Sequence, residues 1–155
     1  MAKTASGEIE RIDAHVHGRP FSNPALYRGS GAAYVKRMRK EGIHGVVLLA
    51  PGEACIKARR KFGDFVIPVP MYRLRTLGRT DLRKDMAHWL DRGCKGIKFI
   101  APLHPYSDER YWPLYQEVAD RGAVAVFHTG YLGFSGTEPE IPPIEMANMR
   151  AAHID

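Results

Sequence analysis

The chain has 155 residues, of which 45% are hydrophobic and 26% are charged, so it is long enough for one domain with a hydrophobic core. No apolar run approaches the roughly twenty residues of a membrane span, and residues 1–11 lack the apolar stretch of a signal peptide. The net charge is +6, but the basic residues are spread over several segments, which favours solvated helix faces over a nucleic-acid site. A milder role for this charge is to attract an anionic small molecule. We therefore expect a cytoplasmic protein with a small-molecule substrate that binds neither nucleic acid nor a membrane.

Several common functional frameworks are absent from the sequence. Cys55 and Cys94 lie far apart and form no CxxC pair, which excludes a disulfide framework or a zinc ribbon and predicts two reduced, mostly buried thiols. No phosphate-binding glycine loop follows the first predicted strand, and no Gly-x-Ser-x-Gly elbow occurs. Nucleotide-binding and serine-hydrolase functions are therefore excluded.

Segments with strand and helix patterns alternate along the chain. In chain order we predict a strand at 9–16, a helix at 25–41, a strand at 45–50, a helix at 53–62, a strand at 65–71 weakened by two prolines, a helix at 80–92, a strand at 95–101, a helix at 108–121, a strand at 123–127 and a final helix at 144–155. Residues 1–8 are predicted to be a flexible leader, and 9–155 a single domain. This alternation predicts a parallel sheet with right-handed crossovers, and both a doubly wound sheet and a barrel fit it.

Three histidines follow predicted strands at the end where parallel α/β folds bind ligands. His15 and His17 are two residues apart, so in a strand both imidazoles point to the same face, and a Gly-Arg-Pro turn follows them. His128 ends a later strand, directly before Thr129. Three imidazoles at one sheet edge suit a divalent metal ion that keeps one position for water. The alternatives are surface histidines for the first two and a partly buried core histidine for His128.

These segments resemble those of a known family, the amidohydrolase-related (amidohydrolase 2) metal-dependent hydrolases. Residues 12–17 (IDAHVH) resemble its opening strand, and 96–99 (GIKF) its fourth strand. Residues 111–130 are similar to its fourth helix and fifth strand, and 149–155 to the segment leading toward its sixth strand. The resemblance implies a (β/α)8 TIM barrel with one divalent metal at its carboxyl-end face, held by His15, His17 and His128. Zinc is the first choice, with manganese, iron or cobalt as alternatives.

The resemblance covers only part of such a barrel. A complete (β/α)8 barrel needs about 250 residues. The family's catalytic histidine on the sixth strand and its metal-binding aspartate on the eighth have no counterpart here, so the catalytic residues are unknown. We therefore expect a barrel truncated after the fifth strand. Its unpaired sheet edges predict a homo-oligomer or a completing polypeptide.

Five residues near the predicted carboxyl-end face are candidates for substrate binding: Lys98, Arg19, Arg73, His104 and Tyr106. Arginines in these loops can clamp a carboxylate through two hydrogen bonds, or simply be exposed. Lys98 lies within the fourth strand, where some relatives carry a carboxylated lysine that bridges two metals. Binding of a substrate carboxylate and plain solvation are the other roles open to it.

The leading hypothesis is an enzyme that hydrolyses a small, anionic amide, ester or lactone through a metal-activated water, as the resemblance implies. A second keeps the same barrel and metal but decarboxylates or hydrates a small carboxylic acid. A third is a non-catalytic half-barrel fragment whose role is assembly, or which has no remaining role.

Overall fold

The computed structural model describes residues 10–22, 29–79 and 81–129. The chain divides into two compact units. The first unit comprises Met1–Pro70 and Asp91–Lys95, and the second comprises Met71–Leu90 and Gly96–Asp155.

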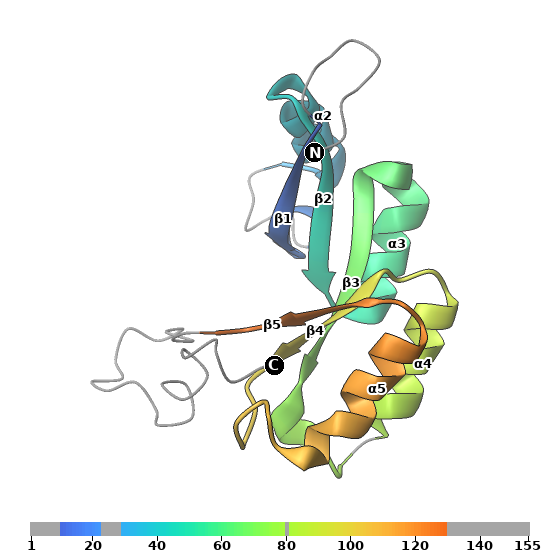
Figure 1. Cartoon of the computed structure of the whole chain (residues 1–155). Helices are drawn as coiled ribbons and strands as arrows, with labels where there is room; N and C mark the ends of the chain where they lie inside the picture. Colours follow the sequence, from blue (N-terminus) through green and yellow to red (C-terminus); the bar gives the residue numbers. More distant parts are fainter. Residues whose placement is uncertain (1–9, 23–28, 80, 130–155) are drawn as a thin grey trace, which may run out of the picture. The chain divides into compact units, whose positions relative to one another are not determined.

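Strands and helices alternate in the described residues (Figure 1). The strands are β1 (Arg11–His17), β2 (Ile43–Ala50), β3 (Val66–Arg73), β4 (Gly96–Ile100) and β5 (Val124–Phe127). The helices are α1 (Arg19–Ser22), α2 (Gly31–Lys40), α3 (Gly52–Phe62), α4 (Leu82–Asp91) and α5 (Trp112–Asp120), with short 3-10 turns at Gly63–Phe65, Leu74–Thr76 and Glu109–Tyr111. None of these described helices is long and apolar enough to cross a membrane.

The order of the strands distinguishes the two architectures that the sequence pattern left open. Every strand pairs in parallel with the next one along the chain, in the order β1-β2-β3-β4-β5. A doubly wound sheet reverses its strand order at a switch point, whereas a (β/α)8 barrel adds each strand on the same side as the one before. No reversal occurs among the described strands, so their order is that of a barrel.

Strand β3 contains two buried prolines and still pairs along its length. Val66–Pro70 pair with β2 in the first unit, whereas Met71–Arg73 pair with β4 in the second. The carbonyl of Pro68 accepts a hydrogen bond from the backbone N–H of Lys95, so Pro68 and, two residues on, Pro70 turn their backbone groups away from β2. Pairing with β4 begins only after Pro70. The missing proline donors therefore interrupt neither ladder.

The core of the first unit lies between β2 and the helices that follow β1 and β2. Val46, Leu48 and Ala50 alternate along β2 and pack with buried residues of α2 and α3. Helix α2 begins later than the 25–41 pattern predicts, because the Ser30 hydroxyl caps it by accepting a hydrogen bond from Ala33 N–H (3.2 Å). The short helix α1 forms where the sequence predicted only a loop.

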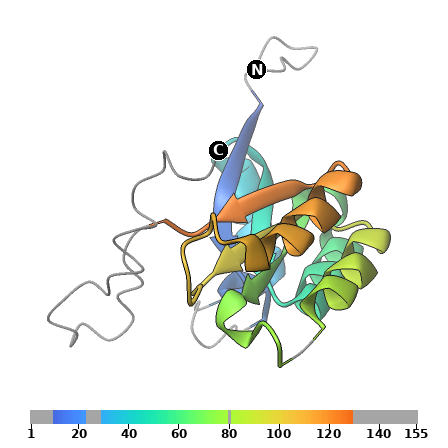
Figure 2. The same cartoon turned by 60° about the horizontal axis from the view of Figure 1, so that its bottom comes forward.

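In the second unit α4 and α5 lie side by side (Figures 1 and 2). Glu117 of α5 is buried, accepts a hydrogen bond from Arg83 of α4 (2.6 Å) and also pairs with Arg121. On the helix-facing side of the sheet, Phe99 of β4 packs against the ring of Tyr115 at 5.2 Å. Phe99 and its neighbours on α5 thus form the core that holds β4 in place.

The other predicted elements differ from the structure mainly at their ends. The predicted helix at 108–121 begins as a 3-10 turn and becomes α5 only at Trp112, since Pro113 lacks a backbone N–H and is tolerated only in a first helical turn. Gly96 opens β4 because a β-carbon there would collide with the carbonyl oxygen of Val124 on β5. The predicted helix at 144–155 and the leader at 1–8 lie outside the described residues, and the single domain over 9–155 stays a prediction.

Both cysteines are buried and unbridged, as the sequence predicted. Cys55 is fully buried and its thiol donates to the carbonyl of Leu48 (3.4 Å). Burial raises the pKa of Cys55 to about 11 and that of Cys94 to about 12. Because the thiolate is the reactive form, we expect neither thiol of the native protein to react with iodoacetamide at pH 8 within minutes. Mass spectrometry should show two additions once guanidinium unfolds the chain, and fast labelling before unfolding would contradict this burial.

Candidate functional site

Two imidazoles converge at the carboxyl end of β1. The Nε2 atoms of His15 and His17 lie 3.2 Å apart, and their ring centroids are separated by 5.0 Å. Two nitrogens that each lie about 2.0–2.1 Å from one tetrahedral zinc ion are about 3.3–3.4 Å apart. The donor set and its spacing therefore fit a shared divalent ion. The same distance also fits a direct hydrogen bond in which one Nε2–H donates to the other ring.

A register shift of the β-bulge type in β1 includes His15. Asp13 of β1 pairs with Val46 of β2, but Val16 pairs with Leu48, so β1 carries one extra residue in this interval. The carboxylate of Asp13 accepts a hydrogen bond from the backbone N–H of His15 (3.0 Å). Bulges next to functional sites change the direction of a side chain, and here Asp13 holds the displaced backbone of His15.

The two faces of β1 have different roles. Val16 is buried in the core on the helix-facing side of the sheet, opposite its partner Leu48. His15 and His17, on either side of Val16 in the sequence, are exposed and point to the other face. The prediction that both imidazoles share one face at the end of this strand is therefore met by the local geometry.

Lys98 is a buried cation in the middle of β4. Only 3% of its surface is exposed, and burial lowers the pKa of its amine. No described residue forms a hydrogen bond or an ion pair with this amine. Because neighbouring residues alternate between faces and Phe99 packs toward α5, Lys98 points to the opposite face of the sheet. The burial of Lys98 is compatible with an anionic partner for its amine, and the three roles considered from the sequence stay open.

Two further candidates share this face in the second unit. Lys98 pairs with Val126 of β5, and the backbone N–H of His128 donates to the carbonyl of Phe99 (3.0 Å), so the ladder continues to His128. His128 therefore lies two residues beyond the position opposite Lys98, on the same face and toward the carboxyl end. Arg73, at the end of β3, pairs with Ile100 and is exposed on this face as well.

The remaining predicted contacts have other surroundings. The ring of Tyr106 is buried against Phe127 on the helix-facing side, and its hydroxyl donates to the carbonyl of Phe99 (3.3 Å). This packing favours a structural role for Tyr106. His104 lies in the loop after β4, with its backbone N–H donating to the Tyr111 hydroxyl (3.2 Å). Arg19 begins α1, and its side chain lies outside the described residues.

The structure thus brings predicted residues together within each unit. His15 and His17 meet in the first unit, and Arg73, Lys98 and His128 share a face in the second. Over the described ranges, no group of three histidine, cysteine or acidic side chains is positioned to hold a metal. His128 as the third ligand therefore stays a prediction. The sequence analysis missed the bond from Asp13 to His15, although an aspartate two residues before a histidine is a recognisable signal for it.

Comparison with known proteins adds one structural likeness. No family model matches the chain, and no curated protein matches it. A crystal structure of 2,6-dihydroxybenzoate decarboxylase complexed with 2,6-dihydroxybenzoate is similar in fold, with a TM-score of 0.57 and 14% sequence identity. The match covers 87% of this chain and 56% of the decarboxylase chain, so this chain spans little more than half the length of that enzyme. Together with the strand order, this likeness confirms the predicted fold class, a partial (β/α)8 barrel.

Proposed function

We propose that this chain carries the first metal-binding strand of an amidohydrolase-related enzyme that hydrolyses a small, anionic amide, ester or lactone. The observation that carries this proposal is the 3.2 Å separation of the His15 and His17 Nε2 atoms at the carboxyl end of β1. Surface histidines two residues apart on a strand need not converge, since each imidazole gains hydration by turning into solvent. Their convergence supports a shared ion.

The residues of this chain would hold one divalent ion, zinc in the first instance and manganese, iron or cobalt as alternatives. His15 and His17 offer imidazole lone pairs, with His128 proposed as the third ligand. Asp13 fixes the backbone of His15 and so restricts the direction of its ring. When bound, such an ion lowers the pKa of a water molecule and polarises a carbonyl group.

Lys98 and Arg73 are proposed to bind the anionic group of the substrate. A buried ammonium group without a counter-ion is costly, and a carboxylate beside it removes much of that cost. Arg73 is exposed at the end of the neighbouring strand, where its planar guanidinium group can form two hydrogen bonds with one carboxylate. Both side chains therefore favour an acidic substrate over a neutral one.

Decarboxylation of a small aromatic or aliphatic acid is the second candidate function. The specific observation in its favour is the fold likeness to 2,6-dihydroxybenzoate decarboxylase. Lys98 supports both candidates equally, because each reaction needs a carboxylate or another anion held against the sheet. The match covers only 56% of the decarboxylase chain. The proposal therefore includes further barrel elements, supplied by a second copy, another polypeptide or a longer form of this protein.

The deciding experiment combines metal content with a substrate panel. The 155-residue chain is purified without chelators, and its metal is quantified by mass spectrometry against protein concentration. A ratio near one ion per chain, removed by a chelator and restored by zinc, supports the proposal. Release of product from lactones, esters or amides favours hydrolysis, and release of carbon dioxide from hydroxybenzoates favours decarboxylation. A chain that neither retains nor takes up a divalent ion contradicts both functions for this molecule.

A further inference from the structure

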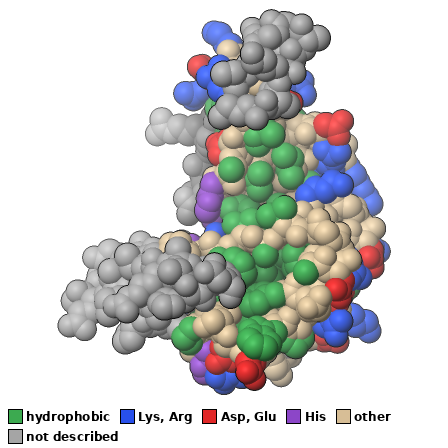
Figure 3. All heavy atoms as spheres, in the orientation of Figure 1, with side chains coloured by type: hydrophobic (Ala, Val, Ile, Leu, Met, Phe, Trp, Pro, Cys, Tyr) green, Lys and Arg blue, Asp and Glu red, His purple; other side chains and the backbone are tan. Residues whose placement is uncertain are grey.

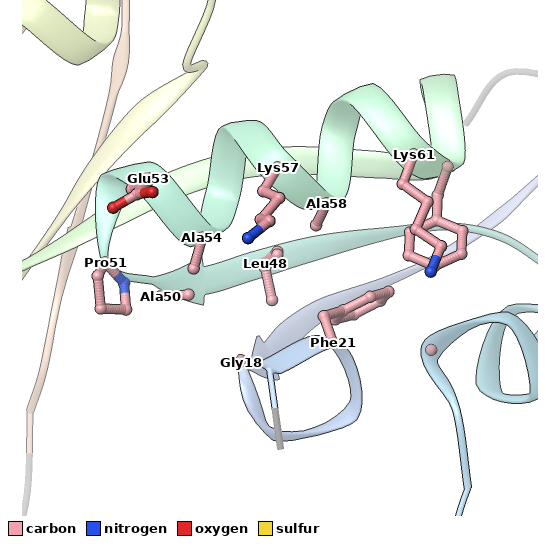
Figure 4. Close-up of a pocket in the computed structure, with 12 residues that line it drawn as sticks. Gly18, Phe21, Leu48, Ala50, Pro51, Glu53, Ala54, Lys57, Ala58 and Lys61 are labelled. Carbon is pink, nitrogen blue, oxygen red and sulfur yellow. The ribbon is translucent and has the colours of Figure 1, made fainter. Parts of the chain in front are cut away.

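A pocket of about 460 Å³ opens in the first unit on the helix-facing side of β2 (Figure 4). Leu48 and Ala50 of β2 form its floor, Phe21 of α1 closes one side, and Ala54 of α3 lies above the floor. Ligand pockets typically have volumes of about 300–1,000 Å³ and mainly apolar walls. This pocket therefore has the size of a site for a small molecule, and its lining combines apolar and polar side chains.

The pocket is separate from the histidine pair. Leu48 on its floor pairs with Val16, and both side chains belong to the helix-facing core. His15 and His17 lie on the opposite face of β1. The pocket and the imidazoles therefore lie on opposite faces of the strands, although Gly18, which follows His17 in the sequence, lines the pocket.

Two lysines give the pocket a positive rim. Lys57 and Lys61 lie one helical turn apart on α3, and both amines point over the space above β2 and Phe21 (Figure 4). Neither amine has a hydrogen bond or ion pair with a described residue, although Lys61 lies over the ring of Phe62 at 5.4 Å. Glu53, the acidic residue of the lining, lies at the other end beside Pro51 (Figure 4).

The residues around the rim of the pocket are also positively charged. Lysine and arginine side chains gather over α3, and its last turn alone carries Arg59, Arg60 and Lys61 (Figure 3). An apolar floor beneath two unpaired ammonium groups is complementary to a molecule with an apolar body and one negative end. A neutral molecule would leave both amines unpaired, and a cation would be repelled.

We propose that this pocket binds a free amphipathic monocarboxylate, with its carbon chain against Phe21 and Ala54 and its carboxylate between Lys57 and Lys61. A free small molecule suits the site better than a membrane surface, because the apolar floor lies at the bottom of a concave pocket. The site is additional to the proposed metal centre, and its occupant is a second ligand of the protein.

Titration of the full chain with octanoate, followed by isothermal calorimetry and by amide chemical shifts, tests this proposal. We expect saturable binding at one site and weaker binding of octanol, which has the same chain without the charge. The variants Lys57→Gln and Lys61→Gln should each weaken octanoate binding by up to about fivefold, the usual effect of losing an exposed ion pair. Lys36→Gln, an exposed lysine of α2 outside the pocket, is the matched control and should leave the affinity unchanged.

A steric variant tests the location. Ala54→Leu adds a branched side chain above the floor and should abolish octanoate binding while thermal unfolding and zinc binding stay as in the parent. Unaltered octanoate affinity in this variant would overturn the pocket as the site, and equal affinities for octanoate and octanol would overturn the role of the lysines. Absence of saturable octanoate binding would overturn the whole proposal. Zinc binding is measured on the same sample, so failure of the pocket can be told apart from failure of the metal site.

Discussion

Replacement of both His15 and His17 by alanine will lower the affinity for zinc by more than about 100-fold. Loss of a residue that only hydrogen-bonds to a metal ligand already lowers metal affinity by about 10–100-fold, and here two ligands are removed. Each single variant retains one imidazole and should bind with intermediate affinity. Competition with a zinc-sensitive dye at pH 7.5, on chain stripped of metal, measures the change. The variant His88→Ala is the control, since it removes an exposed imidazole from helix α4, away from β1.

Asp13→Ala provides an intermediate test of the same site. It removes the acceptor for the backbone N–H of His15 and should weaken zinc binding by about tenfold while both imidazoles remain. Zinc affinity that is the same in the double histidine variant and the parent would refute the metal site. The 3.2 Å contact would then be a hydrogen bond between two surface imidazoles.

The second large effect is expected at Lys98. The substitution Lys98→Met keeps a long side chain but removes the buried amine, so it should raise the free energy of unfolding by about 1–3 kcal/mol at pH 7. The same substitution should abolish binding of an anionic substrate. Such a pair of results is typical of a residue that is retained for function at a cost in stability. Urea unfolding followed by circular dichroism measures the first result.

This gain in stability should depend on pH in a defined direction. Burial lowers the pKa of Lys98 in the folded chain, so between the folded and unfolded pKa values the unfolded state binds more protons. The stability of the parent therefore rises as pH increases through this interval, and the advantage of Lys98→Met shrinks toward pH 10. Lys95→Met is the control, because Lys95 is exposed immediately before β4 and should change stability by less than about 0.5 kcal/mol. A destabilised Lys98→Met variant would show that the amine already has a partner in the native protein.

The sequence predicted the succession of strands and helices well because that succession depends on local patterns. The run at 45–50 and the helix at 53–62 correspond closely to β2 and α3. Errors concentrate at helix starts. For α2 the hydrophobic pattern begins at residue 25, but the hydrogen bond from Ala33 N–H to the Ser30 hydroxyl sets the start of the helix. The two prolines in the 65–71 run weakened that strand prediction. A proline lacks an N–H donor, and whether a neighbouring strand needs that donor can be seen only once the neighbouring strand is known.

The candidate site could be predicted in part. A spacing of two residues places His15 and His17 on one face of any strand, so the sequence was sufficient for that pair. The β-bulge that includes His15 was not predictable, because it arises from the register between β1 and β2, which are separated in the sequence by two helices. The burial of Lys98 likewise depends on β3 and β5, which pack on either side of β4.

The sequence alone determined that strands and helices alternate along this chain, and that His15 and His17 share one face near the end of the first strand. Only the tertiary structure decided that the strands add in one direction, that Lys98 is enclosed, and that Lys57 and Lys61 flank a pocket above β2. The physical reason is the range of the interactions. Strand and helix periodicity is set by neighbours a few residues apart, whereas strand order, burial and cavities depend on contacts between segments distant in the chain.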